Sequence, residues 1–183
     1  MDLRETPISA HYEYKGKIIN LRVDDARLPN GATSKREVVE HPGGVGVLAL
    51  TDKGEALLVQ QFRYPYGEVT TEIPAGKRDP NEDPLATGIR ELAEETGATA
   101  DHIEPLGILY PTPGYCGEII YLYLATGLHF AEQHPDEDEF LNVLRVPLDE
   151  LVERVMAGEI PDAKTQIAAL KAWKLTEGTH YAK

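Results

Sequence analysis

Short runs of strand-forming residues dominate the first third of the chain. Residues 11–28 carry isoleucine, leucine and valine in a strand-like pattern, and the Pro-Asn-Gly at 29–31 is a turn signal ahead of residues 34–40. This pattern predicts a β-hairpin in a front segment that can form an arm. Continuous apolar runs at 45–50 and 56–59 predict two buried strands joined by a tight turn.

A helix is predicted in the middle of the chain. Between Pro84 and Gly97, the apolar residues Leu85, Ile89 and Leu92 recur at helical spacing. Proline is favoured at the first turn of a helix and glycine just after its last turn, so both ends are marked.

The second half of the chain mixes strands and helices around a loop, residues 111–117, that is rich in proline and glycine. The predicted elements are strands at 103–110, 119–124 and 141–146 and helices at 148–157 and 163–175. Neither a repeat nor a Gly, Ser or Pro-rich linker marks a domain boundary. The mixture predicts an α+β fold in which helices cover a mixed sheet.

Composition narrows the class of protein. The 183 residues suffice for one good core, and 31 acidic against 18 basic residues give a net charge of −13. Such a charge disfavours binding to nucleic acid and makes cations the expected partners of any anionic substrate. The lone Cys116 excludes an intrachain disulfide, and the chain shows neither a signal peptide nor a membrane-length apolar run. We therefore expect a soluble, cytoplasmic protein without membrane or nucleic-acid partners.

Three carboxylates on the predicted helix form a candidate cation site. Glu91, Glu94 and Glu95 stand three and four residues apart, so they project from one face toward a common point. Mg²⁺ prefers oxygen ligands and leaves positions open for a substrate phosphate. Arg90 lies four residues before Glu94 and can either pair with a glutamate or touch substrate; we favour the pairing. Taken alone, this hexapeptide is also compatible with a solvated helix face.

The spacing around these acids resembles the Nudix box. Five residues separate Gly76 from Glu82, seven separate Glu82 from Arg90, and Arg-Glu-Leu-Ala-Glu-Glu-Thr-Gly-Ala follows without insertion or deletion. One departure is Ala98, where the family usually has a larger aliphatic residue. The resemblance implies an α/β/α sandwich with a Nudix-like mixed sheet, forming a domain at 43–183 behind an N-terminal antiparallel β arm at 1–42.

The resemblance also implies roles for individual residues. It implies that the box glutamates and a backbone carbonyl bind Mg²⁺, with Mn²⁺ as a possible substitute, and that a glycine, a glutamate and an arginine support them. The implied ligands are Glu91, Glu94, Glu95 and the carbonyl of Ala75, and the implied supporting residues are Gly76, Glu82 and Arg90.

Features outside the box point to the substrate. Pro113 lies 16 residues beyond Gly97 and resembles the proline that marks ADP-ribose pyrophosphatases, and residues 36–45, 60–64 and 72–76 are similar to segments of the bacterial enzymes. The resemblance implies hydrolysis of ADP-ribose to AMP and ribose 5-phosphate; another nucleoside diphosphate, such as a nucleotide sugar, is the alternative. The implied substrate-binding residues are Arg36, Arg63, Glu72 and Pro113.

The residue types suit ADP-ribose but leave alternatives open. Arg36 and Arg63 can bind the diphosphate or can form surface ion pairs. Tyr12, Tyr14 and Tyr64 can stack on adenine or pack in the core and across strands.

Attack on phosphorus requires an activated water, and the acidic stretch 136–139 falls where the resembled enzymes carry a catalytic glutamate. Glu139 is our first choice of base and Glu137 our second; a solvated charged loop is the alternative. Cys116 has no histidine near it in sequence and is interpreted as structural, and the histidines lack the spacing of zinc ligands.

Two further hypotheses concern class and assembly. A module that senses ADP-ribose without cutting it is the rival to an enzyme, but every box acid is present and little room follows Gly158 for a DNA-binding domain. The resembled family typically forms dimers, so the arm at 1–42 is expected to support a homodimer, either exchanged between chains or docked on its own core.

Overall fold

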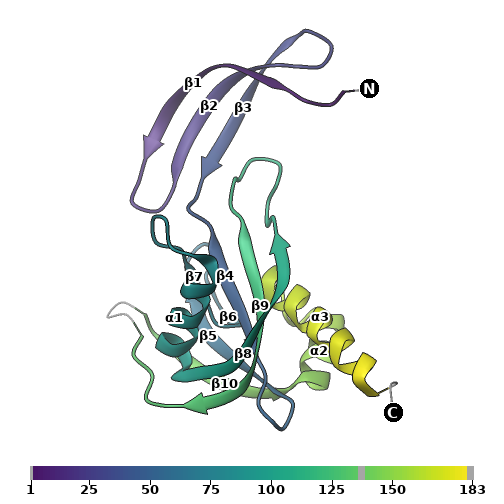
Figure 1. The fold of residues 1–183 in the computed structure, drawn as a ribbon. Coiled ribbons are helices and arrows are strands. Elements are labelled where there is room, and N and C mark those ends of the chain that lie inside the picture. Colours follow the sequence, from purple (N-terminus) through teal and green to yellow (C-terminus); the bar gives the residue numbers. More distant parts are fainter. Residues whose placement is uncertain (1, 136–138, 181–183) are drawn as a thin grey trace. The chain divides into compact units, whose positions relative to one another are not determined.

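The computed structural model describes residues 2–135 and 139–180 of the chain (Figure 1). Its elements, in chain order, are β1 (Thr6–Lys15), β2 (Asn20–Arg27), β3 (Thr33–Glu40), β4 (Gly44–Ala49), β5 (Glu55–Arg63), β6 (Glu68–Glu72), β7 (Ala75–Lys77), α1 (Pro84–Thr96), β8 (Ala98–Leu109), β9 (Ile120–Phe130), β10 (Leu141–Pro147), α2 (Leu148–Met156) and α3 (Ala163–His180). The α+β fold with an N-terminal antiparallel arm is confirmed. Within the described residues, no helix is both long and apolar enough to span a membrane.

The chain forms two compact units. The first comprises residues 1–43 and 110–119, and the second comprises residues 44–109 and 120–183. In the first unit, β1, β2 and β3 form an antiparallel sheet, and a turn at 28–32 joins β2 to β3 as the Pro-Asn-Gly signal predicts. The backbone of Val39 in β3 bonds to Tyr115 and Gly117. The loop rich in proline and glycine therefore belongs with the arm strands, which the sequence does not indicate.

The second unit contains two sheets. One is a mixed sheet in the order β7-β4-β9-β8, in which β4 and β9 run parallel, and the other is antiparallel in the order β10-β5-β6. The predicted strands at 45–50 and 56–59 are β4 and β5, joined by a turn closed by a bond from Gly54 N–H to the Thr51 carbonyl. Although they are consecutive, they belong to different sheets.

Alternate side chains of β4 pack on opposite faces of the mixed sheet. Val45 and Val47 belong to a cluster with Leu92 of α1, whereas Leu48 packs into the larger cluster that contains residues of α2 and α3. Since successive strand side chains point to opposite faces, a fully apolar strand is buried from both sides. Figure 1 shows α1 and α3 on opposite sides of β4 and β9. The sandwich expected from the sequence is confirmed.

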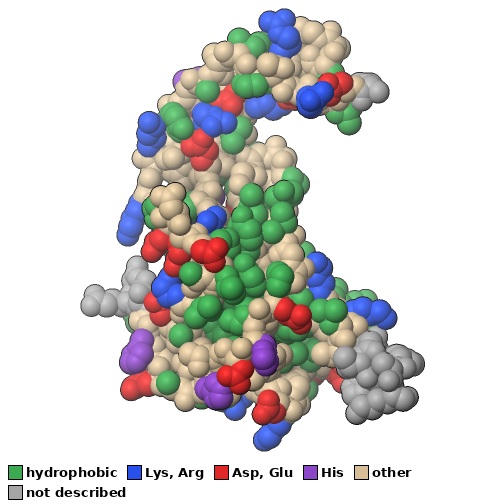
Figure 2. All heavy atoms as spheres, in the orientation of Figure 1, with side chains coloured by type: hydrophobic (Ala, Val, Ile, Leu, Met, Phe, Trp, Pro, Cys, Tyr) green, Lys and Arg blue, Asp and Glu red, His purple; other side chains and the backbone are tan. Residues whose placement is uncertain are grey.

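Several element bounds differ from the predictions. β8 begins at Ala98, five residues before the predicted start, β9 runs on to Phe130, and the short strands β6 and β7 were not predicted. Most residues of β8 are exposed or half-buried, so apolar alternation is weak along it. Its strand conformation comes from the antiparallel ladder with β9, and such pairing leaves little trace in a single sequence. Figure 2 shows hydrophobic side chains exposed over β8 and β9.

Candidate active site

Helix α1 is fixed by local signals at both ends. The Asp83 side chain accepts hydrogen bonds from the N–H groups of Leu85 and Ala86, and Pro84 occupies the first turn. Gly97 ends the helix with a φ of 68°, and a Cβ at this position would lie 2.3 Å from the carbonyl oxygen of Ala131. Glycine is required there for both reasons.

The buried face of α1 is the face that carries carboxylates. Glu91 and Glu95 are only 7% and 2% exposed. Of the three apolar residues that set the helical periodicity, Leu92 is fully buried, whereas Leu85 and Ile89 are 36% and 46% exposed. Gly88 lets this face approach β4 closely, because a Cβ there would lie 3.1 Å from the methyl groups of two valines. The helix therefore presents acidic side chains to the interior of the second unit.

Glu95 is a buried carboxylate without a cationic hydrogen-bond partner among the described residues. Its Oε2 accepts a hydrogen bond of 2.9 Å from the N–H of Ala75. Burial raises its pKa to about 8, and the charges of Glu139 and Glu91 add to this effect, while the Ala75 bond and the charge of Arg63 oppose it. A cation bound beside Glu95 would offset this cost, because its positive charge stabilises the ionised carboxylate.

Glu91 lies directly against the backbone of the box glycine. A Cβ on Gly76 would lie 1.9 Å from the carboxyl carbon of Glu91, so any other residue would displace this carboxylate. Burial raises the pKa of Glu91, and the charges of Glu94 and Glu139 act in the same direction against that of Arg90. Gly76 thus makes room for the carboxylate.

Arg90 holds three glutamates. It forms ion pairs with Glu91 and Glu94, each at 2.8 Å, and two hydrogen bonds of 3.2 Å to Glu82. Glu82 also accepts from the Thr87 hydroxyl, and these bonds lower its pKa to about 2. Arg90 therefore pairs with glutamates, the role that we favoured for it from the sequence. Its two hydrogen bonds to Glu82 hold the guanidinium in place.

The donor set fits a hard divalent cation. Glu91, Glu95 and Glu139 influence one another electrostatically, and all supply oxygen, the ligand atom that Mg²⁺ and related ions prefer. In the part of the chain that the structure describes, no three Asp, Glu, His or Cys side chains form a preassembled metal group, although Glu91 and Glu94 both accept a hydrogen bond from Nη1 of Arg90. Arg90 neutralises Glu94 on the outer flank of the helix, while Glu95 lies inside.

Glu139 lies near the helix carboxylates. The chain after β9 is held to the end of α1 by hydrogen bonds from Ala131 N–H to the Gly97 carbonyl and from His134 N–H to the Glu94 carbonyl. The half-buried Glu139 follows this segment, and its charge raises the pKa values of both Glu91 and Glu95. Glu137, the second choice of base, lies outside the described residues, as do the neighbouring acids at 136 and 138.

Arg63 and Glu72 bind each other. Nε and Nη2 of Arg63 donate to the two carboxylate oxygens of Glu72, each at 2.7 Å. Burial raises the pKa of Glu72, but the bonds from Arg63 and Thr70 and the charge of Lys164 outweigh it and lower the pKa to about 2. Lys164 donates a hydrogen bond to the same carboxylate. Sequence analysis missed Lys164, because a lysine at the start of a helix carries no sign of a partner 92 residues away.

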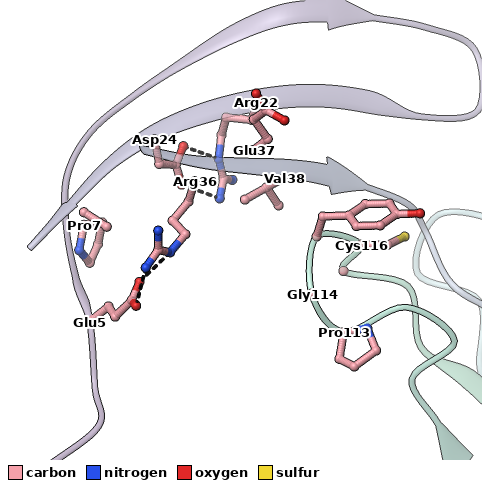
Figure 3. A pocket seen from close by; sticks show the side chains of 13 residues that line it. Glu5, Pro7, Arg22, Asp24, Arg36, Glu37, Val38, Pro113, Gly114 and Cys116 are labelled. Carbon is pink, nitrogen blue, oxygen red and sulfur yellow. Dashed lines mark hydrogen bonds and ion pairs between the residues drawn. The ribbon is translucent and has the colours of Figure 1, made fainter. Parts of the chain in front are cut away.

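The other two predicted substrate residues line one cavity in the first unit. Arg36 and Pro113 lie around a space of about 430 Å³, together with Arg22, Asp24 and Cys116. Figure 3 shows Arg36 paired with a glutamate of the N-terminal segment, Arg22 paired with Asp24, and Pro113 on the loop across the cavity. This cavity combines arginines with carboxylates, groups that bind phosphates and ribose hydroxyls respectively.

The tyrosines considered for stacking lie outside the core. Tyr12 and Tyr14 project from β1, and Tyr64 follows β5 and is 88% exposed. The amino group of Lys15 lies 4.3 Å from the centre of the Tyr12 ring. None of the three packs in the core, so that part of the alternative is wrong, whereas the Tyr12 hydroxyl does bond to Glu40 across the sheet.

Fold and site together define an α+β protein whose helix α1 carries two buried carboxylates, Glu91 and Glu95. Comparison with known proteins gives the family. The NUDIX domain profile matches residues 40–169, and the profile of the nucleoside diphosphate sugar hydrolase N-terminal domain matches residues 5–39. The chain belongs to the Nudix family, whose hydrolases generally depend on divalent metals.

Individual relatives cover nearly the whole chain. It is 45% identical over 168 residues to the ADP-ribose pyrophosphatase of Bacillus subtilis, an alignment that covers 91% of each protein. It is 43% identical over 166 residues to the methanol dehydrogenase activator of Bacillus methanolicus, covering 90% of each. The crystal structure of an ADP compounds hydrolase superposes with a TM-score of 0.85 at 20% identity, covering 98% of both chains, and so shares the fold.

Proposed function

We propose that this chain catalyses the Mg²⁺-dependent hydrolysis of ADP-ribose to AMP and ribose 5-phosphate. The observation that carries the proposal is the pair of buried carboxylates in the second unit, Glu91 and Glu95, of which Glu95 interacts electrostatically with the guanidinium of Arg63. Hydrolysis of a diphosphate requires a cation and a hydrogen-bond donor to its oxygens. The carboxylates can bind the cation, and the guanidinium can donate the hydrogen bonds. The likeness to an ADP-ribose pyrophosphatase supports this choice of substrate.

Each group then has a role. Glu91, Glu94, Glu95 and the carbonyl of Ala75 would hold the cation, and a bound cation would supply positive charge to offset that of the diphosphate. Glu139 accepts a proton from the attacking water, the water oxygen bonds to phosphorus, and the bridging oxygen leaves with the other phosphate.

The substrate residues act in different ways under this proposal. Arg63 binds the diphosphate, and Glu72, which is 3% exposed, acts by holding Arg63. Arg36 and Pro113, with their cavity, contribute to recognition of the nucleoside or the ribose.

A substrate panel tests the proposal. With Mg²⁺, the protein is expected to release AMP from ADP-ribose with a kcat/KM in the ordinary enzymatic range, about 10⁴ M⁻¹ s⁻¹ or above. Nucleotide sugars form the competing set, because the match of residues 5–39 to a nucleoside diphosphate sugar hydrolase domain favours them. If a nucleotide sugar is turned over faster and ADP-ribose hardly at all, the proposed substrate is wrong, although the proposed hydrolysis of a diphosphate still holds.

We also propose that the arm supports a homodimer. Within residues 2–40, Asp24 and Ala26 alone are buried, and Ile8, Tyr14 and Ile18 are each at least half exposed. A three-stranded sheet without a core of its own is marginally stable unless another surface covers it. Figure 2 shows charged side chains between the hydrophobic ones on the visible face of this sheet.

Light scattering coupled to gel filtration tests the dimer. We expect a mass of twice the 20.2 kDa of one chain. Ile8→Asp is expected to shift the protein toward the monomer, because it places a charge in the covered surface. Glu13→Gln on the same strand is the control and should leave the mass unchanged; a monomeric parent protein would refute the proposal.

A further inference from the structure

The start of α3 reaches across the second unit to the end of β6. Nζ of Lys164 donates hydrogen bonds to Glu72 and, at 2.9 Å, to Asp162. Lys164 is 9% exposed and Glu72 is 3% exposed, so these charges meet in the interior. A buried ion pair contributes little to stability compared with apolar packing. We therefore look for a role of Lys164 in positioning Glu72.

Glu72 passes this constraint to Arg63. The two carboxylate oxygens that Lys164 and Thr70 hold also receive the paired bonds from Arg63. Such a two-point contact fixes the plane of the guanidinium as well as its position. Nη1 of Arg63 has no hydrogen-bond partner within the described residues, and about a third of the side chain is exposed. The Nε and Nη2 edge of the guanidinium is therefore bound to Glu72, and the Nη1 edge can bind another group.

The same turn of α3 also fixes the backbone next to Glu72. The hydroxyl oxygen of Thr165 accepts a 2.8 Å hydrogen bond from the N–H of Ile73, and Thr165 in turn donates to Asp162. Two residues beyond Ile73, the N–H of Ala75 bonds to the carboxylate of Glu95. Arg63 and Glu95, which interact electrostatically, are thus both tied to the start of α3.

We propose that Lys164 is a positioning residue for catalysis: by holding Glu72, it orients the guanidinium of Arg63 toward the diphosphate of the substrate. The inference rests on the proposed function, in which Arg63 binds that diphosphate. Without the lysine, the Glu72 carboxylate keeps one cationic partner and gains freedom to rotate with Arg63. Loss of orientation weakens binding of the diphosphate in the ground state and in the transition state alike, so KM rises more than kcat falls.

A double-mutant cycle tests this inference. Lys164→Met should lower kcat/KM about 10- to 100-fold, the usual cost of removing a group that orients a binding residue. Arg63→Ala should lower it at least as much. If Lys164 acts through Arg63, the double variant should be no worse than Arg63→Ala, because nothing remains for the lysine to orient.

Controls separate positioning from general stability. Lys171→Met makes the same substitution later in α3, where the lysine bonds to the carbonyl of Leu106, and it should leave kcat/KM within about twofold. Thermal melts of each variant report folding. Where the methionine variant unfolds, Lys164→Gln, which keeps a donor without the charge, takes its place in the cycle.

The outcomes are distinct. Multiplicative losses in the double variant, or a fall in kcat with unchanged KM, would overturn the positioning role. The cycle is measured first as kcat/KM for the best nucleoside diphosphate substrate. It is then measured again as the Kd for ADP-ribose, determined by calorimetry in the presence of Mg²⁺. Failure of the parent protein to cleave ADP-ribose counts against the proposed function alone, whereas the coupling of Lys164 with Arg63 is judged from the ratios among variants.

Discussion

Replacing Glu95 with glutamine should lower turnover by about 10² to 10³-fold or more while leaving the fold intact. The carboxylate is 2% exposed and interacts with the charges of Glu91 and Glu139, so it is the least solvated of the proposed cation ligands. Glutamine is a neutral and weak ligand for a hard divalent ion. The measurement is AMP release as a function of Mg²⁺ concentration, in which the concentration for half-maximal activity should rise steeply.

The fold should survive this change for a physical reason. Because burial raises the pKa of Glu95 to about 8, the neutral form dominates at neutral pH in protein stripped of metal, and glutamine resembles that form. The amide oxygen can accept the hydrogen bond that Ala75 N–H now donates. A melting temperature in chelator within a few degrees of the parent value is expected. Unchanged turnover would refute the assignment of Glu95 as a metal ligand.

The sequence was sufficient for α1 because its signals are local. Asp83, Pro84 and Gly97 act within one turn of the helix ends, and the observed helix spans Pro84–Thr96 as the punctuation predicts. Strands β4 and β5 were likewise predictable from short apolar runs. Their separation into different sheets was not, because it depends on pairing with β9, β10 and other distant strands.

The buried face of α1 was harder to predict. Of the predicted apolar stripe only Leu92 is buried; Leu85 and Ile89 are exposed, and two glutamates of α1 take interior positions instead. Hydrophobic periodicity assumes that a helix buries its apolar side, and that assumption fails where a helix delivers charged groups to a site. The spacing of the Nudix box did point to these glutamates, because the motif is defined by residue identities and not by hydrophobicity.

Contacts between distant segments left no trace in the sequence. Lys164 and Glu72 are 92 residues apart, and each taken alone resembles a surface charge. The loop containing Pro113 likewise joins the arm strands through backbone bonds to Val39, which any residue can make. Such partners become visible only when the fold has been built.

Replacing Glu139 with glutamine is the second change with a large expected effect, a fall in kcat of about 10² to 10⁴-fold, as for loss of a general base. The half-buried carboxylate interacts electrostatically with Glu91 and Glu95, the proposed cation ligands. Glu137→Gln is the matched control, since it removes the same charge two residues earlier. It should retain kcat within a few-fold; a reversal of the two results would move the base to Glu137.

The Mg²⁺ dependence of the Glu139→Gln variant then separates a base from a ligand. A base contributes to proton transfer and little to cation affinity, so the Mg²⁺ concentration for half-maximal activity should stay within a few-fold of the parent value while kcat falls. A ligand would raise that concentration strongly, and excess Mg²⁺ would restore part of the rate. The backbone bonds of Ala131 to Gly97 and of His134 to Glu94 do not involve the Glu139 side chain, so its substitution should leave them in place.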